Sequence, residues 1–526
     1  MSNNPRNPLQ EKVAYRLDVI VLMICLVLFF VSMKPTFMRP LTWDEVDYVV
    51  ASEMGIYTNA MERGSLNIHQ FIKLGMDKLK KRRGSVVNDE SKDPFILRHF
   101  HPPLPTYYWS LLLSLSKKMN SREVILRYGM VALGALAILV FFLSLRHIDL
   151  VGHTNSNLGI ILVIPIMVNS KIFVGGFSIL NFHAFHLIAV TIFVASFINF
   201  LRCSNLRSSI LFGISMSLVV LTLETSAFIF VGAILSLLIL KIKIDKRRVI
   251  QAFTIFLIIT LVAWPGVIWT LGPVKSWLMY VYRIFAVGNA EYKNVSFATS
   301  WVPILKENWA VFLVILLGLI VNRVTYRQGE KSLRDILIPF IIGGFYLFAI
   351  SPFLISSTYI APAIILLLIG SGMAINKIKV KNLHKALVAV PVLVLIVHGQ
   401  LTTGDMKEYN LRGHFYKELS ILRKYIDPAR PMLADGGHIF RYYFELSTSK
   451  IIDLHFFDWD NPGYYIRSAY EYIDISQEIK MHKYNPIIVR RHRPLKNNYF
   501  NKIVQDGYHR IDTDMFMIFT LNPDRV

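Results

Sequence analysis

Long uncharged apolar runs recur along the first 400 residues and constrain the fold more than any other feature of the chain. A helix needs roughly 17–25 apolar residues to cross the hydrocarbon core of a bilayer. The backbone finds no water there, so a run that enters the core folds as a helix. We therefore expect a polytopic α-helical membrane protein with about eleven transmembrane helices. The candidate spans are about 17–33, 128–145, 158–174, 183–201, 209–223, 226–241, 249–270, 309–322, 335–354, 359–375 and 385–399.

The charge balance assigns each loop to a side of the membrane. The chain has 57 Lys and Arg residues against 35 acidic residues, a net charge of +22. If the short apolar segment 104–116 lies along the interface, six alternate loops together hold 19 of the basic residues and five acids. Because cytoplasmic loops are enriched in Lys and Arg, we predict a cytoplasmic N-terminus and a juxtamembrane helix at 104–116. The excess charge thus reports topology, and no nucleic-acid partner is expected.

Two long segments, 34–127 and 271–308, then share the outer face with the tail from about residue 400. In the tail, short apolar runs alternate with amphipathic stretches, a pattern typical of an α/β domain. We expect a membrane domain at 1–399, with its chemistry in the outer segment 34–127, and a small extracytoplasmic α/β domain at 400–526. The tail is expected to form helices at Phe415–Tyr425 and Ile439–Leu446, and strands at Met432–Ala434, Ile451–Leu454, Ile487–Val489 and Met515–Leu521.

Two adjacent carboxylates, Asp44 and Glu45, lie about ten residues beyond the first span. Ionisable groups so close to the hydrocarbon are costly unless they face a polar cavity, a partner or a cation. The alternative is a helix N-terminus, which Thr42 would cap and where the helix dipole favours acidic residues. The two residues alone leave both interpretations open.

Two further motifs change that balance. Phe100-His101-Pro102-Pro103-Leu104 leads into the expected juxtamembrane helix, and a Tyr-x-x-Pro pattern begins at Tyr359, near the start of a late span. With the early Asp-Glu pair, they resemble the motifs of the GT-C membrane glycosyltransferases, which include protein O-mannosyltransferases and the lipid A aminoarabinose transferase. The outward α/β tail resembles the aminoarabinose-transferase-like branch of that family.

The resemblance implies an inverting transfer of a sugar from a polyprenyl-phosphate donor to an acceptor hydroxyl on the outer face. It implies Asp44 as the base, and Glu45 as a residue that shapes the site or helps to bind a metal. The chemistry requires a base for the acceptor's proton and groups that hold the leaving phosphate. His101 is a candidate phosphate or metal ligand, with Arg98 a weaker candidate beside it. The alternative for His101 is an interfacial histidine packed against the two prolines.

Two more residues are candidates for binding the donor phosphate. Arg283 follows an aromatic run in the second outer segment, where relatives carry a basic residue, and a guanidinium suits bidentate phosphate binding. The alternative is an arginine that reaches to the lipid headgroups. Tyr359 could donate a hydrogen bond to the donor lipid, or serve only as an interfacial anchor.

The chain departs from the family at two places. Many relatives have an Asp at the outer start of the fourth span, where this chain has Asn181-Phe182-His183. Many have Thr-Lys between the fifth and sixth spans, where this chain has Leu223-Glu224-Thr225. Losing that lysine and gaining Glu224 puts the family's phosphate-binding scheme in doubt, and Glu224 is interpreted as an outer turn residue.

The sequence therefore predicts a membrane-embedded hexosyl or pentosyl transferase, mannosyltransferase-like, that acts in cell-envelope glycosylation. A bacterial inner membrane is favoured over the endoplasmic reticulum. The expected partners are a polyprenyl-phosphate-sugar donor and a glycan, lipid or protein acceptor. No cofactor is certain, and a divalent metal ion at Glu45 and His101 stays open. The alternatives are a transporter or flippase of lipid-linked sugars, which would need ionisable residues in mid-span, and a catalytically degenerate lipid-binding relative.

Overall fold

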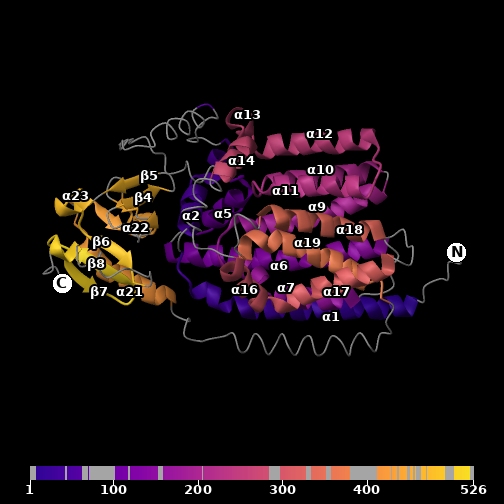
Figure 1. The fold of residues 1–526 in the computed structure, drawn as a ribbon, viewed down its shortest axis with the longest axis horizontal. Helices are drawn as coiled ribbons and strands as arrows, with labels where there is room; N and C mark the ends of the chain where they lie inside the picture. Colours follow the sequence, from indigo (N-terminus) through magenta and orange to yellow (C-terminus); the bar gives the residue numbers. More distant parts are fainter. Residues whose placement is uncertain are drawn as a thin grey trace.

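The computed structural model is a long bundle of helices with a smaller α/β domain at one end (Figure 1). The ranges that the structure describes are 8–41, 44–61, 69, 101–116, 119–151, 158–203, 205–282, 297–326, 333–350, 357–378, 411–427, 429–434, 437–446, 451–453, 456–457, 464–468, 471–474, 476–491 and 503–521. The predicted span at 385–399 lies outside them.

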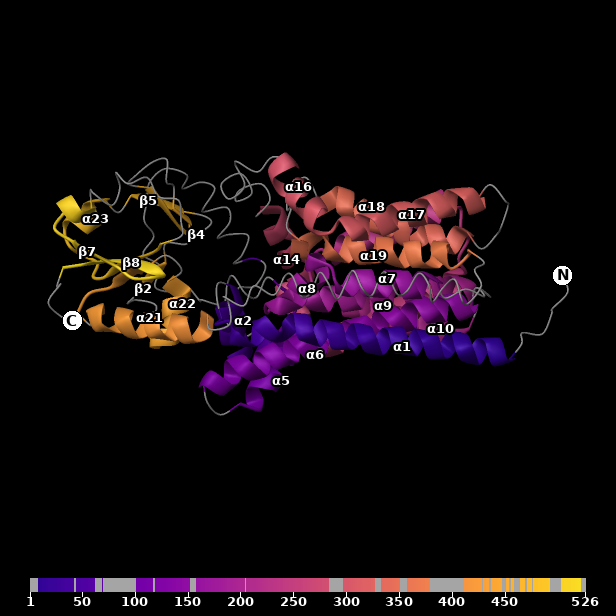
Figure 2. The ribbon, with the colours of Figure 1, turned by 90° about the horizontal axis from the view of Figure 1, so that it is seen from below.

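The bundle is made of helices that run along the long axis of the molecule (Figures 1 and 2). They are α1 (Pro8–Met33), α6 (Met119–Val151), α7 (Leu158–Val168), α8 (Lys171–Ser178), α9 (Phe182–Arg202), α10 (Leu206–Val220), α11 (Ser226–Ile239), α12 (Lys246–Ala263), α17 (Trp309–Tyr326), α18 (Leu333–Ile350) and α19 (Ser357–Ile375). Shorter helices lie where the bundle meets the α/β domain: η1 (Lys34–Met38), α2 (Asp44–Glu53), α3 (Gly55–Met61), α5 (Leu104–Ser114), α13 (Val267–Thr270), α14 (Gly272–Tyr282) and α16 (Phe297–Glu307).

The apolar helices identify an integral membrane protein. Among the described residues, four helices are long and apolar enough to cross a bilayer, or up to six if each of two bent helix pairs counts as one span. The outer surface of α12 is apolar and exposed, as expected of a helix that faces lipid. Its side chains Ile250, Phe253, Ile258 and Val262 are all about half exposed or more. Side chains of this kind are stable when they face lipid.

One of the predicted spans is bent in the structure, and two other predicted features are present. The predicted span 158–174 is bent by 53° between α7 and α8. Pro165 lies inside α7, and Ser170 begins a new helix by accepting a hydrogen bond from the Phe173 N–H. The expected break near 223–226 is confirmed, because α10 ends at Val220 and α11 begins at Ser226. The segment predicted as a juxtamembrane helix is α5, an eleven-residue helix.

Charged side chains gather at the end of the bundle where α1 begins. Arg202 Nε and Asp335 Oδ2 are 2.6 Å apart, and they join α9 to α18. Arg248 of α12 donates to the Phe200 carbonyl and, at 3.0 Å, to the Ser208 hydroxyl. The helix ends that flank several of the loops predicted to be cytoplasmic lie at this end, and the α/β domain lies at the opposite end (Figure 1).

The α/β domain contains two sheets. The larger has the order β2-β1-β6-β8-β7, with β1 parallel to β2 and β6, and β8 antiparallel to β6 and β7. The smaller is the antiparallel sheet β3-β4-β5. The strands are β1 (Met432–Ala434), β2 (Ile451–Asp453), β3 (Phe456–Phe457), β4 (Tyr464–Ser468), β5 (Glu471–Asp474), β6 (Ile487–Arg490), β7 (His509–Asp512) and β8 (Phe516–Thr520), and the helices are α21 (Leu411–Tyr425), α22 (Gly437–Phe444) and α23 (Ser476–Lys480).

The helices and strands expected in the tail are present, with ends shifted by a few residues. The strands β3, β4, β5 and β7 and the helix α23 were not predicted from the sequence. The exposed, charged strand β7 (His509–Asp512) lacks the apolar run that predicts a strand. It forms because its backbone pairs with β8.

Close packing in the bundle leads to a test of the fold. A Cβ on Gly159 of α7 would lie 2.1 Å from the Gly372 carbonyl oxygen of α19, whereas a Cβ on Gly344 of α18 would meet nothing within 4 Å. We expect Gly159→Ala to lower the melting temperature in detergent by several degrees, because two helix backbones must separate. Gly344→Ala should leave it unchanged or raise it slightly, because alanine favours the helix. Equal melting curves for the two variants would contradict this packing.

Candidate active site

A buried ion pair between Glu45 and Arg127 organises the end of the bundle beneath the α/β domain. The Glu45 side chain in α2 and the Arg127 side chain in α6 are 4% and 1% exposed. Arg127 donates through Nη1 to Oε1 of Glu45 and through Nη2 to Oε2, the latter at 3.0 Å. This two-pronged geometry is the strongest that a guanidinium and a carboxylate form.

The same pair connects two further segments to α2. Arg127 also donates to the carbonyl oxygens of Pro40, at 2.8 Å, and Ser178, at 3.2 Å. Glu45 Oε1 accepts from the Leu180 N–H at 2.8 Å. The chain before α2 and the connection between α8 and α9 are thus fixed to α2. Asp44 is the first residue of this helix, and its side chain lies outside the described part of the structure.

His101 and Glu224 form a second ion pair. Their Nδ1 and Oε2 atoms are 2.9 Å apart, and their side chains are 16% and 8% exposed. Burial by itself raises the pKa of the Glu224 carboxyl, but the charge and hydrogen bond of His101, with a smaller contribution from His183, lower the pKa below its ordinary value. A backbone hydrogen bond of 3.0 Å from Leu104 to Leu221 also holds the two segments together. Glu224 is therefore a turn residue, as expected, and also the partner of His101.

Aromatic rings pack around His101. Its ring centroid lies 4.5 Å from that of Phe182 in α9 and 6.4 Å from that of Tyr48 in α2. Tyr48 is stacked on the buried Trp109 of α5 at 5.3 Å. The imidazole is thus held by rings from two helices while its Nδ1 faces a carboxylate. Its position does not depend on the adjacent prolines alone.

A line of buried polar groups lies beside this pair. His186 of α9 has its Nδ1 2.9 Å from the Thr222 hydroxyl and its Nε2 3.5 Å from the Thr225 hydroxyl, which in turn accepts from Tyr346 of α18 at 2.9 Å. His183, one turn earlier in α9, contacts the ring of Tyr359 at 4.3 Å between centroids. The N-termini of α9 and α19 therefore meet at the candidate site.

The predicted site residues divide into two groups, those that lie in this region and those outside the described residues. Glu45, His101 and Tyr359 belong to this one region, and the backbone of Asp44 starts α2 within it. Arg98 and Arg283 lie outside the described residues. At the two family positions that differ, Asn181 caps α9 by accepting from the Ala184 N–H, and Glu224 pairs with His101.

Sequence reasoning missed Arg127, the residue that holds Glu45. The sequence feature that could have indicated Arg127 is its place at the edge of a long apolar run, one helical turn after the acidic residue Glu123. Such residues are commonly interfacial, so the pattern did not distinguish a buried pair from a headgroup contact.

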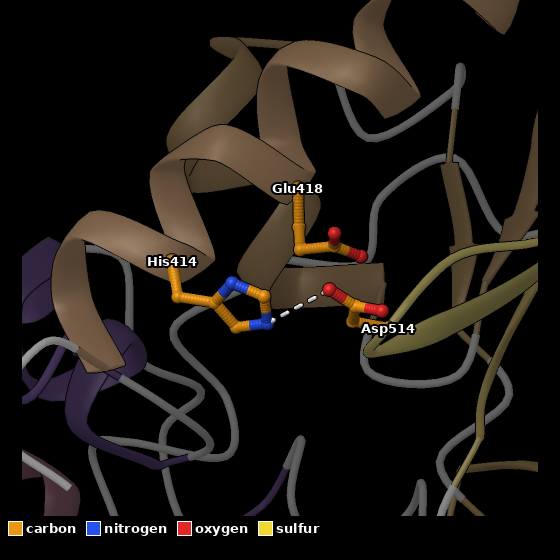
Figure 3. A group of neighbouring side chains, drawn as sticks. All are labelled: His414, Glu418 and Asp514. Carbon is orange, nitrogen blue, oxygen red and sulfur yellow. Dashed lines mark ion pairs between the residues drawn. The ribbon is translucent and has the colours of Figure 1, made fainter. Parts of the chain in front are cut away.

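The described residues include one group of three side chains that could hold a metal ion: His414, Glu418 and Asp514. Figure 3 shows the first two on α21 and the third on the turn before β8. Their ligand atoms lie within 4.8 Å of one another, and His414 Nε2 is 3.7 Å from Asp514 Oδ2. This group belongs to the α/β domain and shares no residue with the Glu45 and His101 pairs. Glu45, which was considered as a metal ligand, has both carboxylate oxygens bound by Arg127.

Comparison with known proteins identifies the fold. No family model and no curated protein matches the sequence. Among solved structures, the chain resembles ArnT from Cupriavidus metallidurans bound to undecaprenyl phosphate, with a TM-score of 0.57, 12% identity, and coverage of 96% of this chain and 98% of that one. The apo state of the same protein gives 0.55, with 13% identity and coverage of 98% and 99%. The chain has a GT-C fold.

A second GT-C structure supports this assignment at lower coverage. The archaeal oligosaccharyltransferase AglB from Archaeoglobus fulgidus, in complex with an inhibitory peptide and a dolichol-phosphate, gives a TM-score of 0.51 at 10% identity. The match covers 96% of this chain and 74% of AglB. The ArnT match includes nearly the whole of both chains, so the α/β domain is part of the shared arrangement. The GT-C fold predicted from the sequence motifs is thereby confirmed.

Removing Arg127 from the buried ion pair should lower the free energy of unfolding far more than removing a partner from a more exposed ion pair. We expect Arg127→Met to destabilise the protein by about 3–5 kcal/mol, because it leaves Glu45 as an uncompensated buried charge. The double variant Glu45→Gln/Arg127→Met should recover part of that loss. Arg122→Met is the control, because Arg122 and Glu53 join the same two helices with side chains 35% exposed. Its cost should stay below about 1 kcal/mol. Thermal unfolding in detergent measures all three, and equal effects of Arg127→Met and Arg122→Met would argue against a buried pair.

The second pair predicts a dependence of stability on pH. Since the pKa of folded Glu224 lies below its ordinary value of 4.5, the pair stabilises the fold above that pH. The contribution is lost as the pH falls through the folded pKa. We expect Glu224→Gln to melt at a lower temperature than the wild type near pH 7, and the difference to shrink near pH 4. A difference that stays constant across this range would contradict the prediction.

Proposed function

We propose that this protein is an inverting glycosyltransferase that moves a sugar from a polyprenyl-phosphate donor to an acceptor hydroxyl at the outer face of the membrane. The Asp44 carboxylate takes the proton of the acceptor hydroxyl. The acceptor oxygen then forms a bond to the anomeric carbon as the bond from that carbon to the phosphate oxygen breaks. The polyprenyl phosphate leaves with the bonding electron pair.

The observation that carries the assignment of Asp44 is the fixed state of its neighbour. Glu45 is bound by both Nη atoms of Arg127 and by the Leu180 N–H, so its lone pairs are already committed. Consecutive helix positions are about 100° apart, so the Asp44 position is not on the face that Glu45 turns to Arg127. We propose that Glu45 positions α2, and that Asp44 carries the proton transfer. This division of labour gives Glu45 a role that needs no metal ion.

The GT-C fold supports the lipid donor. A donor that dissolves only in the bilayer explains why the chain devotes so many apolar helices to one enzyme, and ArnT, which shares this arrangement, was solved with undecaprenyl phosphate. We propose that His101 contacts the leaving phosphate. Its Nδ1 is 2.9 Å from Oε2 of Glu224, which fixes the orientation of the ring, and the opposite Nε2 edge is the one that would contact the phosphate. Arg98, Arg283 and Tyr359 stay candidates for the same phosphate.

The proposed sidedness follows from the arrangement of charge. The described helix ends that flank the basic loops lie at the end of the bundle where α1 begins, and the Glu45 and His101 pairs lie at the opposite end with the α/β domain. By the positive-inside rule, the basic end is cytoplasmic and the candidate site faces outward. We propose eleven spans in a bacterial inner membrane, with a glycan, lipid or protein hydroxyl as the acceptor.

Asp44→Asn tests the function directly. The donor is the lipid-linked sugar that accumulates in a deletion strain, identified by mass spectrometry and extracted for use with reconstituted protein. We expect transfer by Asp44→Asn to fall by about 10²–10⁴-fold, because the acceptor proton has no base. Binding of undecaprenyl phosphate, followed by native mass spectrometry, should be retained. Asp47→Asn, a change of the same type one turn further along α2, is the matched control and should transfer normally.

The outcomes separate the competing functions. Full transfer by Asp44→Asn would overturn the assignment of the base. Wild-type protein that binds undecaprenyl phosphate without any transfer would indicate a catalytically degenerate relative. Movement of the accumulated lipid across vesicle membranes without transfer would indicate a flippase.

A further inference from the structure

The α/β domain contacts the start of α2 through one tyrosine hydroxyl. Tyr443 lies on α22, and its hydroxyl accepts a hydrogen bond of 3.0 Å from the backbone N–H of Leu41. The same hydroxyl is 2.7 Å from Glu123 Oε1 and 3.1 Å from the Leu41 carbonyl oxygen. A hydroxyl has one proton, and the shorter contact leads to a carboxylate, so Tyr443 donates to Glu123. In both views of the ribbon, α2 lies beside α22 (Figures 1 and 2), and α21 contacts η1, just before α2 in the chain.

The carboxylate that accepts this hydrogen bond is completely buried. Glu123 lies in α6 and is 0% exposed. A second tyrosine, Tyr416 of α21, donates to the same oxygen at 2.9 Å. A carboxylate out of contact with water is costly unless its oxygens are hydrogen-bonded. Two tyrosines from the α/β domain thus stabilise a buried acid of the membrane domain.

Aromatic packing holds the two tyrosines in place. Their ring centroids are 5.7 Å apart in an edge-to-face arrangement, and Phe415 packs against Tyr443 at 5.2 Å. Phe440, on the same helix as Tyr443, contacts Phe516 of the larger sheet at 5.5 Å. Both hydroxyls are therefore presented by a rigid framework. Burial first, and then the charge of Glu123, raise the pKa of Tyr443 well above its ordinary value, so the hydroxyl keeps its proton.

Two routes lead from these tyrosines to the Asp44-Glu45 pair. Along the chain, Leu41 is three residues before Asp44. Along α6, Glu123 is one helical turn before Arg127, which binds Glu45 and the Pro40 carbonyl. The α/β domain and the buried ion pair therefore hold the same short segment from two sides.

We propose that Tyr443, Tyr416 and Glu123 form a clamp through which the α/β domain positions the catalytic helix α2. The clamp residues contact neither donor nor acceptor. They are positioning residues that fix the backbone at Leu41, and with it the first turn of α2. Their effect on transfer rests on the function proposed above, whereas their effect on the backbone at Leu41 does not. The α/β domain is thus a structural part of the active site.

The test compares Tyr443→Phe with Tyr442→Phe. Tyr442 is the next residue on the same helix, and its buried hydroxyl has no hydrogen-bond partner among the described residues. Both changes remove one buried hydroxyl, but only the first removes the bonds to Leu41 and Glu123. Hydrogen–deuterium exchange of peptides covering residues 34–61 is measured on the full-length protein in nanodiscs. We expect exchange near Leu41 to be about tenfold or more faster in Tyr443→Phe, and unchanged in Tyr442→Phe.

Transfer kinetics separate positioning from loss of fold. With the donor extracted from the deletion strain, Tyr443→Phe should lower turnover by about 10–100-fold, because a small misplacement of the base is enough. The affinity for undecaprenyl phosphate should stay within about twofold of the wild type. Tyr416→Phe should have a smaller effect, because Tyr443 still binds Glu123. Glu123→Gln keeps an acceptor oxygen for both tyrosines and should retain more turnover than Glu123→Leu.

Two results would overturn the clamp. One is wild-type exchange at Leu41 in Tyr443→Phe, which would show that the hydroxyl does not hold this segment. The other is full turnover in Tyr443→Phe despite faster exchange, which would show that the segment's position does not matter for transfer. If no protein, including the wild type, transfers the sugar, the proposed function fails, and the exchange experiment still decides whether Tyr443 fixes Leu41.

Discussion

The arrangement of the candidate site depends on one buried pair of opposite charges. Moving a carboxylate and a guanidinium out of water is costly, and the cost is recovered only with good geometry and further hydrogen bonds. Glu45 and Arg127 meet both conditions through their two-pronged contact and through bonds to Leu180, Ser178 and Pro40. Because the pair and its partners come from three parts of the chain, residues 40–45, α6 and the connection between α8 and α9, the pair fixes how those parts meet. The orientation of α2 and its position relative to α6 are therefore set by the contacts of this ion pair.

Polar interactions elsewhere at this end follow the same logic. His101 and Glu224 join the segment before α5 to the turn before α11, and the clamp of Tyr443, Tyr416 and Glu123 joins the α/β domain to α6. Each junction pairs an acid with a donor from a distant segment. Among the described helices, the middle of the bundle is packed mainly by aliphatic and aromatic side chains. The polar groups thus lie at one end of an apolar bundle. This distribution favours an enzyme with its site at the membrane surface over a transporter, which would need ionisable residues in mid-span.

Several features of the fold could be read from the sequence because their causes are local. Apolar runs of spanning length form helices wherever they enter lipid, so most of the predicted spans correspond to helices. The strand Met432–Ala434 and the break before Ser226 were likewise visible in short stretches of sequence. The bend at Ser170 was not predicted, because the segment still has the length and average hydropathy of one span although Asn169, Ser170 and Lys171 interrupt it. Strand β7 was missed because its stability comes from its neighbour β8.

The sequence by itself determined that this is a helical membrane protein with a basic end, an α/β tail and an acidic pair beside the first span. These properties can be read from hydropathy, charge and turn residues, because each of these signals comes from residues close together in the sequence. Only the tertiary structure decided which acid is engaged and which partners hold it. Glu45 and Arg127 are 82 positions apart, and Leu41 and Tyr443 are 402 positions apart. A buried charge takes its partner from whatever segment the fold brings near, and no local pattern records that choice.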